Sequence, residues 1–139
     1  MFHILHRSDQ RKGAIAAVEF EGASYGAGVS FFIGDLEPGK GPRLHKHPYS
    51  ETCIIRSGQA AMTIDGKDIV AGPGDIVVIK PETVHGFTAI GPERLVAVCI
   101  HSSDHFIIEC LDDVIERAAR CPTEGAGGTS RRKPKRNQI

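Results

Sequence analysis

The chain has 139 residues, its 17 basic side chains balance its 17 acidic ones, and 40% of its residues are hydrophobic against 24% charged. This length suits one domain and leaves no room for a second, and the composition excludes a chain that is disordered throughout. The longest unbroken apolar run is residues 95–100, far below the roughly 20 residues that span a bilayer, so we expect no membrane segment.

The first residues, 1–7, lack the apolar core and small-residue cleavage site of a secretion signal, so we expect a cytoplasmic protein. The cysteines fit this expectation because they form no Cys-x-x-Cys pair. We therefore expect four free thiols, at Cys53, Cys99, Cys110 and Cys121.

Between residues 25 and 101, short apolar runs alternate with turn signals such as Asp65-Gly66 and Pro73-Gly74. Short runs with this punctuation favour hairpins, and their regular spacing predicts an all-β sandwich or barrel rather than a parallel α/β fold. We expect strands at residues 29–33, 51–56, 60–64, 68–71, 75–80, 85–90 and 95–101. The apolar run 75–79 is predicted to be buried.

After residue 103, apolar residues recur at three- and four-residue spacing, which predicts an amphipathic α-helix over about 104–120. Ser103 or Asp104 would cap its first turn, and Arg117 and Arg120 would complement the helix dipole at its end. We expect its apolar face to pack on the barrel or on a second subunit.

A homodimer is expected, because the apolar face of this predicted helix is available to a second subunit. Segments 2–5 and 14–20 look like strands that pair across subunits, and a barrel of this kind has exposed edge strands.

The end of the chain, residues 122–139, is rich in glycine, proline and basic residues and holds few apolar side chains. Such a segment cannot bury enough surface to become ordered, so we predict one domain over 1–121 and a disordered basic tail over 122–139. The basic run 131–136 is compatible with nucleic-acid contact or an import signal, but no helix-turn-helix accompanies it. We expect a solvated tail and no nucleic-acid partner.

Four residues are predicted to form a metal site. His45 and His47 are two positions apart, so in a strand their imidazoles point to one face. The turn Pro48-Tyr49-Ser50 brings the carboxylate of Glu51 back beside them, and His85 begins a later strand that faces the same interior. Imidazole and carboxylate ligands suit one divalent transition metal, which would be Fe, Mn, Ni, Co, Cu or Zn, and leave octahedral positions for substrate or oxygen.

The spacing Gly39-x5-His45-x-His47-x3-Glu51-x6-Gly58 resembles the first motif of the cupin superfamily at every position. Residues 74–85 are similar to the second motif in the spacing from glycine to histidine, but Glu82 stands where that motif has glycine. Ala89 stands where the motif ends in asparagine. The resemblance covers about residues 26–101 and implies a small antiparallel β-barrel or jelly roll with the metal ligands inside one open end.

Strand phase places further residues on the inner walls of such a barrel. These wall residues are either core residues or substrate contacts, and they are Tyr49, Cys53, Met62 and Phe87. His101 shares a phase with Ala97 and Cys99, and is either an acid/base group in the pocket or an ordinary edge histidine. The candidate catalytic residues are Glu51, His101 and Tyr49.

Cupins include dioxygenases, isomerases, decarboxylases and non-catalytic small-molecule sensors, so the fold does not decide the activity. The resemblance implies a metal-dependent cupin that acts on a small oxygen-bearing molecule. We expect an enzyme of the dioxygenase or isomerase kind. The alternative is a non-catalytic module that binds or senses a small molecule through its metal.

Overall fold

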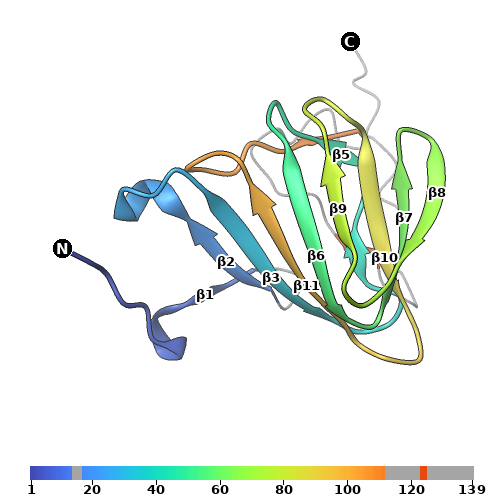
Figure 1. Ribbon diagram of the computed structural model, residues 1–139, viewed down its shortest axis with the longest axis horizontal. Helices are drawn as coiled ribbons and strands as arrows, with labels where there is room; N and C mark the ends of the chain where they lie inside the picture. The colour runs from blue at the N-terminus through green and yellow to red at the C-terminus, as the bar shows by residue number, and fades with distance from the viewer. Residues whose placement is uncertain (14–16, 112–122, 125–139) are drawn as a thin grey trace, which may run out of the picture.

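The computed structural model describes residues 1–13, 17–111 and 123–124. The described residues fold into two larger antiparallel sheets that face each other, with the first strands extending to one side (Figure 1). The six-stranded sheet has the order β1 (Arg11–Lys12), β2 (Val18–Glu21), β3 (Ser30–Leu36), β11 (Leu95–His101), β6 (Glu51–Ser57) and β9 (Ile76–Ile79). This architecture confirms the all-β, cupin-like fold class.

The facing sheet has the order β12 (Glu109–Cys110), β5 (His45–Lys46), β10 (His85–Ile90), β7 (Gln59–Ile64) and β8 (Lys67–Ala71). A small third sheet pairs β4 (Gly41–Pro42) with β13 (Thr123–Glu124). Two short 3-10 helices, η1 (Arg7–Asp9) and η2 (Gly22–Tyr25), complete the described elements. Among the described residues, no helix has the length and apolar character needed to cross a membrane.

The predicted strands from residue 29 to residue 101 are confirmed with small shifts at their ends. The Asp65-Gly66 signal forms the hairpin between β7 and β8, where both residues have positive φ, 51° and 74°, as a type I′ turn requires. Gly58 connects β6 to β7 with φ 74°, and a Cβ at this position would collide with the backbone of Arg94. Glycine is therefore required at this second turn.

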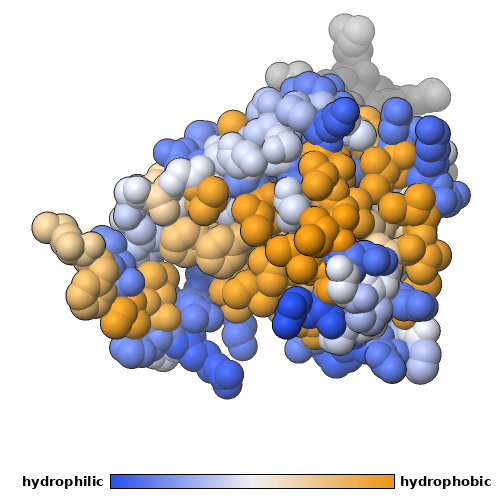
Figure 2. All heavy atoms as spheres, in the orientation of Figure 1, coloured by the Kyte–Doolittle hydropathy of each residue, from blue (hydrophilic) through white to orange (hydrophobic). Residues whose placement is uncertain are grey.

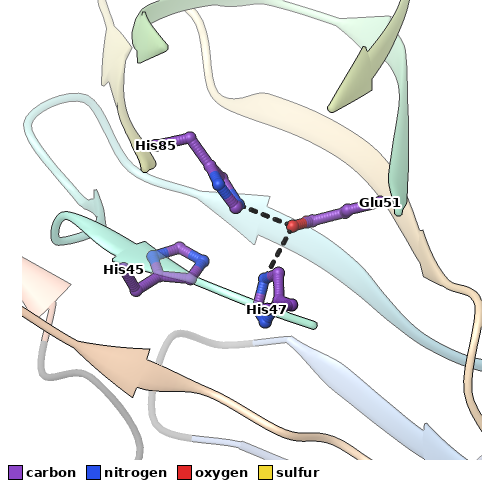
Figure 3. A group of neighbouring side chains, drawn as sticks. All are labelled: His45, His47, Glu51 and His85. Carbon is purple, nitrogen blue, oxygen red and sulfur yellow. Dashed lines mark hydrogen bonds and ion pairs between the residues drawn. The ribbon is translucent and has the colours of Figure 1, made fainter. Parts of the chain in front are cut away.

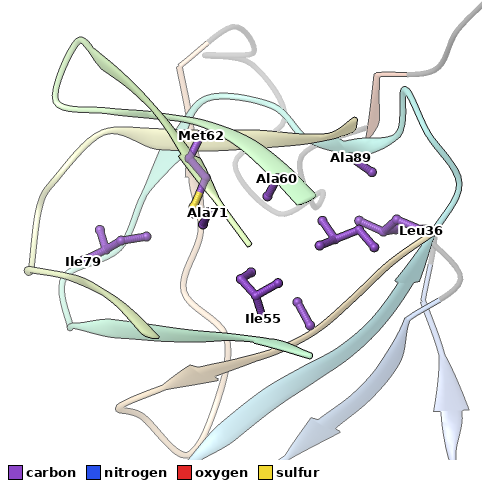
Figure 4. Close-up of a cluster of buried hydrophobic side chains, with 9 residues drawn as sticks. Leu36, Ile55, Ala60, Met62, Ala71, Ile79 and Ala89 are labelled. Atoms are coloured by element: carbon purple, nitrogen blue, oxygen red, sulfur yellow. The ribbon is translucent and has the colours of Figure 1, made fainter. Parts of the chain in front are cut away.

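The hydrophobic core lies between the two sheets (Figure 4). Its side chains come from alternate positions of the strands, as the period of two in a strand dictates. The buried core residues are Leu36, Ile55, Ala60, Met62, Ala71, Ile79, Ala89, Leu95 and Ala97.

The outer face of the six-stranded sheet is also apolar in part. Ile76 and Val78 on the edge strand β9 are 64% and 62% exposed, whereas their neighbour Ile79 is buried. Figure 2 shows hydrophobic atoms gathered across the middle of this face. The expectation that the whole run 75–79 is buried is therefore wrong, because β9 is an edge strand with one face toward solvent.

The helix predicted over 104–120 does not begin where expected. Residues 104–111 contain no helix, and Glu109 and Cys110 form strand β12 against β5. Tertiary contacts explain the difference. The Phe106 ring stacks on Phe32 with centroids 4.2 Å apart, and both backbone groups of Ile107 bond to side chains of the site described below instead of within a helix. Residues 112–120 lie outside the described residues.

Three further expectations are affected at the ends of the chain. Segment 2–5 is not a strand, and of segment 14–20 the described part forms a strand only from Val18. Within the predicted disordered tail, 122–139, Thr123 and Glu124 form a strand paired with β4, and the rest of the tail lies outside the described residues. Cys110 is disulfide-bonded, so the expectation of a free thiol is wrong there, while Cys53 and Cys99 are free.

Candidate metal centre

The four predicted metal ligands meet at one end of the space between the sheets (Figure 3). His45 in β5 lies directly opposite His85, the first residue of β10, and His47 follows β5 immediately. Glu51 begins β6 in the other sheet. Their ligand atoms all lie within 4.8 Å of one another, and each residue is only 1–5% exposed. The structure thus brings together His45, His47, Glu51 and His85 as the sequence predicts.

Each of the three imidazoles is held by a backbone carbonyl. Nδ1 of His45 donates to Arg43 at 2.5 Å, Nδ1 of His47 to Ile107 at 2.8 Å, and Nδ1 of His85 to Thr83 at 2.8 Å. Because a carbonyl oxygen only accepts hydrogen bonds, each Nδ1 must carry a proton. In the neutral ring the lone pair is then on Nε2, which is the arrangement that orients histidine ligands toward a metal.

Two of these Nε2 atoms face the same carboxylate oxygen. Oε2 of Glu51 lies 3.0 Å from Nε2 of His47 and 2.7 Å from Nε2 of His85. With both Nδ1 atoms protonated, these are contacts between lone pairs and a negative oxygen, and they are stable only with a positive charge between them. A metal ion bound by all these atoms supplies that charge, and a proton on one imidazole is the alternative. The donor set therefore fits a divalent transition metal.

The pKa values of His45, Glu51 and His85 are shifted by burial and by the neighbouring groups of the cluster. Burial, together with the nearby His85, lowers the pKa of His45 from 6.5 to about 4, so His45 stays neutral and able to bind a metal at neutral pH. Burial alone would raise the pKa of Glu51, but its contacts with His101, His47 and His85 outweigh burial and hold it well below the ordinary value. Burial alone would lower the pKa of His85, yet the Glu51 carboxylate raises it.

A fifth imidazole, His101, borders the cluster from the end of β11, opposite Glu51 in the register with β6. The Tyr49 hydroxyl accepts a hydrogen bond from the backbone N–H of Ile107 at 3.1 Å and donates to Nδ1 of His101 at 2.8 Å. This leaves the His101 proton on Nε2, which lies 3.5 Å from Oε1 of Glu51. Burial raises the pKa of Tyr49 to about 12, so the hydroxyl keeps its proton. All three candidate catalytic residues therefore lie at this site.

A pocket with a volume of about 80 Å³ opens beside the cluster. His45, Glu51 and His101 line it on the side of the candidate metal ligands. The remaining lining residues are mostly apolar, and they are Glu19, Phe32, Gly34, Leu36, Pro42, Phe87, Leu95, Ala97, Cys99 and Ile108. Of the wall residues expected from strand phase, Phe87 lines the pocket. Tyr49 does not line it, Met62 lies in the core, and Sγ of Cys53 lies 3.4 Å from Oε1 of Glu51.

Two features of the site were missed by sequence reasoning. Glu19 lines the pocket although it lies in the N-terminal region, and the alternation Val18-Glu19-Phe20-Glu21 indicates the opposite, because it would place the apolar Val18 and Phe20 on the inner face. The carbonyl of Ile107 holds His47 from 60 residues away in sequence. No local pattern could have indicated that contact.

The comparisons with known proteins agree with this geometry. Residues 32–101 match the model of the cupin domain family. The chain belongs to the cupin family. No curated protein sequence matches it.

Solved structures of oxalate decarboxylases are similar in fold to this cupin. An oxalate decarboxylase studied for its substrate binding mode is 20% identical with a TM-score of 0.68, covering 84% of this chain and 39% of the other. The formate complex of Lactobacillus farciminis oxalate decarboxylase is 21% identical with a TM-score of 0.69, covering 78% and 35%. A Bacillus subtilis oxalate decarboxylase variant is 24% identical with a TM-score of 0.64, covering 74% and 29%. This chain spans well under half the length of these proteins.

Proposed function

We propose that this cupin binds one divalent transition metal through His45, His47, Glu51 and His85, and that it is an enzyme that oxidises or isomerises a small oxygen-bearing molecule in the adjoining pocket. The observation that supports the metal site best is the pair of imidazole nitrogens facing one carboxylate oxygen of Glu51. When bound, the metal acts as a Lewis acid that polarises the oxygen atoms of the substrate.

The protein residues have separable roles in this proposal. The apolar pocket walls exclude water, which strengthens electrostatic interactions at the reacting oxygen atoms. His101 presents its Nε2–H to the pocket that it lines, where it donates a hydrogen bond to a substrate oxygen. Tyr49 is a positioning residue, because its hydroxyl is already engaged with Ile107 and His101. Glu51 acts as a metal ligand.

Oxalate decarboxylation receives less support, although the structural neighbours carry out that reaction by name. Their likeness to this chain is at the level of the fold. Oxalate carries two carboxylates, and among the described residues the pocket lining contains no lysine or arginine that could bind the carboxylate not held by the metal. The apolar walls suit a substrate with little charge instead.

The proposed function also includes a homodimer. The outer face of the six-stranded sheet exposes Ile33, Ile76 and Val78, and β9 is an edge strand. A twofold interface places the same patch on both subunits, and an apolar patch complements itself without any matching of charges. A second copy of this chain is therefore the occupant that fits this face best.

The experiment that separates an enzyme from a binding module uses the purified, metal-containing chain. Oxygen consumption and product formation are followed with a panel of catechols, diketones and sugars, and ligand binding is measured on the same samples. We expect turnover of at least one compound, and its loss in His101→Ala with metal content retained. Tight binding of a compound with no turnover across the panel would contradict the enzyme and support the non-catalytic module.

A further inference from the structure

The pocket beside the metal ligands is formed mainly by carbon atoms. Phe32 and Leu36 from β3, Leu95 and Ala97 from β11, and Phe87 from β10 form its walls. An apolar group placed against such walls gains by leaving water, whereas a charged group loses its hydration. The walls therefore favour a ligand with an apolar body.

The charges around the pocket support the same selection. Apart from the metal ligand Glu51, the acidic lining residue is Glu19, whose side chain is 5% exposed. Its Oε2 accepts hydrogen bonds from Nη2 of Arg11 at 3.0 Å and from Nε at 3.2 Å. The Arg11 side chain is 63% exposed, does not line the pocket, and is already paired with Glu19. Within the described residues, the pocket thus offers no cation to an anionic group of a ligand.

The space in the pocket depends on small residues on neighbouring strands. Gly34 in β3 lies directly opposite Ala97 in β11, and both line the pocket. A Cβ at Gly34 would meet its nearest atoms, the Ala97 carbonyl oxygen and Cγ of Leu36, at 3.7 and 3.9 Å. These are ordinary contacts, so the backbone tolerates a side chain here, and glycine is not required for the fold. Because Gly34 has no side chain, the space beside it in the pocket is left for a ligand.

Resting on the proposed metal site, we propose that this pocket selects small molecules that join two neighbouring metal-binding oxygen atoms to an uncharged apolar body, and that Gly34 sets the size of that body. The two oxygens would lie on the side of the pocket lined by His45, Glu51 and His101, and the body against the wall formed by β3 and β11. A ligand with a second negative charge is disfavoured.

Two hydroxamates with the same pair of oxygen atoms test the apolar selection. Their affinities for the metal-containing chain are measured by titration calorimetry, which needs no catalytic turnover. We expect benzohydroxamate to bind about tenfold or more tightly than acetohydroxamate, because the phenyl ring buries more apolar surface than the methyl group. Equal affinities would overturn the selection.

Variants at Gly34 test its role in setting the size of the ligand body. Gly28→Ala is the matched control, because a Cβ at Gly28 meets nothing within 4 Å and Gly28 does not line the pocket. We expect Gly34→Val to weaken benzohydroxamate binding about tenfold and to change acetohydroxamate binding less than about twofold. Gly34→Ala, which keeps ordinary contacts, is expected to act in the same direction by about threefold and remains decisive where the valine variant fails to fold. Unchanged benzohydroxamate binding in Gly34→Ala would overturn the assignment of Gly34.

The charge selection is tested with butyrohydroxamate and succinohydroxamate, which differ at the end of the chain by a methyl group against a carboxylate. We expect the charged compound to bind about tenfold or more weakly. Equal or tighter binding of succinohydroxamate would overturn the selection against charge. Metal analysis of the same samples separates failure of the proposed function from failure of the selectivity. A chain without bound metal would contradict the proposed function itself. A metal-containing chain with no preference among these ligands would contradict only the selectivity.

Discussion

Glu51 and His85 approach each other from opposite sheets, with Oε2 of the carboxylate 2.7 Å from Nε2 of the imidazole. The proposed metal ligands therefore connect β6 to β10 across the end of the barrel, while the hydrophobic core connects the same sheets farther inside. Because the core does not include the ligands, the fold is expected to persist without metal, and the bound metal is expected to add stability.

The first prediction concerns pH and His45 in the metal-free chain. Its pKa is lowered from 6.5 to about 4 by burial, with a further contribution from His85. Between these values the unfolded chain binds a proton that the folded chain does not, so stability is complete above pH 6.5 and falls as the pH falls toward 4. Urea unfolding at pH 7 and pH 5 should show a loss of about 2 kcal/mol from this residue.

The control for this prediction is His45→Gln, which removes the titrating group. Its unfolding free energy should change less between the two pH values than that of the wild type. The raised pKa of His85 acts in the opposite direction, since its contribution is lost as the pH rises, and it is retained in both proteins. An identical pH dependence of wild type and variant would contradict the assignment.

The second prediction concerns Glu82, which has φ 61° in the turn before His85. A left-handed backbone is unfavourable for glutamate and free of strain for glycine, so Glu82→Gly is expected to stabilise the protein by about 1 kcal/mol in urea unfolding. The loss of its exposed ion pair with Lys46, at 3.2 Å, removes only a small part of this gain. Glu93→Gly, at an exposed position without positive φ, serves as the control and should destabilise instead.

The third prediction concerns Tyr49. In Tyr49→Phe the backbone N–H of Ile107 and Nδ1 of His101 lose their partner, so the unfolding free energy should fall by about 1–2 kcal/mol. The NMR signals of the His101 ring should change as well. Tyr25→Phe, in the other tyrosine and at the surface, is the matched control and should have little effect. Equal effects of the two substitutions would show that the Tyr49 hydroxyl does not hold His101.

The fourth prediction concerns the homodimer. Val78→Asp introduces a charge into the exposed apolar face of β9 and should convert the dimer to a monomer with a mass near 15.0 kDa by light scattering. Val70→Asp is the control because Val70 is similarly exposed, at 61%, but belongs to β8 in the other sheet. A wild-type mass of one chain at micromolar concentration would reject the dimer, and dissociation only by Val70→Asp would place the interface elsewhere.

The sequence predicted the central strands and the clustering of His45, His47, Glu51 and His85 from local patterns and motif spacing. Alternation and turn signals define β3 and β6 to β11, and the short spacing of His45, His47 and Glu51 keeps these three residues near one another along the chain. The helix over 104–120 was predicted from periodicity alone. Residues 106 and 107 instead use their ring and backbone groups for contacts with Phe32, His47 and Tyr49, which no local pattern contains.

The partners of the site were the least predictable part. Sequence phase placed His101 on an inner face but could not show that Tyr49 orients it, because the two are 52 residues apart. Glu19 belongs to a strand that precedes the cupin motifs, so no motif indicates its place in the pocket lining. The cytoplasmic location remains a prediction.

Metal analysis of purified variants by mass spectrometry tests the central claim most directly. The account predicts about one divalent transition metal ion per chain in the wild type and in the control His105→Ala, whose side chain is exposed and outside the cluster. His47→Ala and His85→Ala should lower metal affinity at least about tenfold while the chain stays folded by circular dichroism. Full metal occupancy in both folded variants would contradict the assignment of His45, His47, Glu51 and His85 as the metal site.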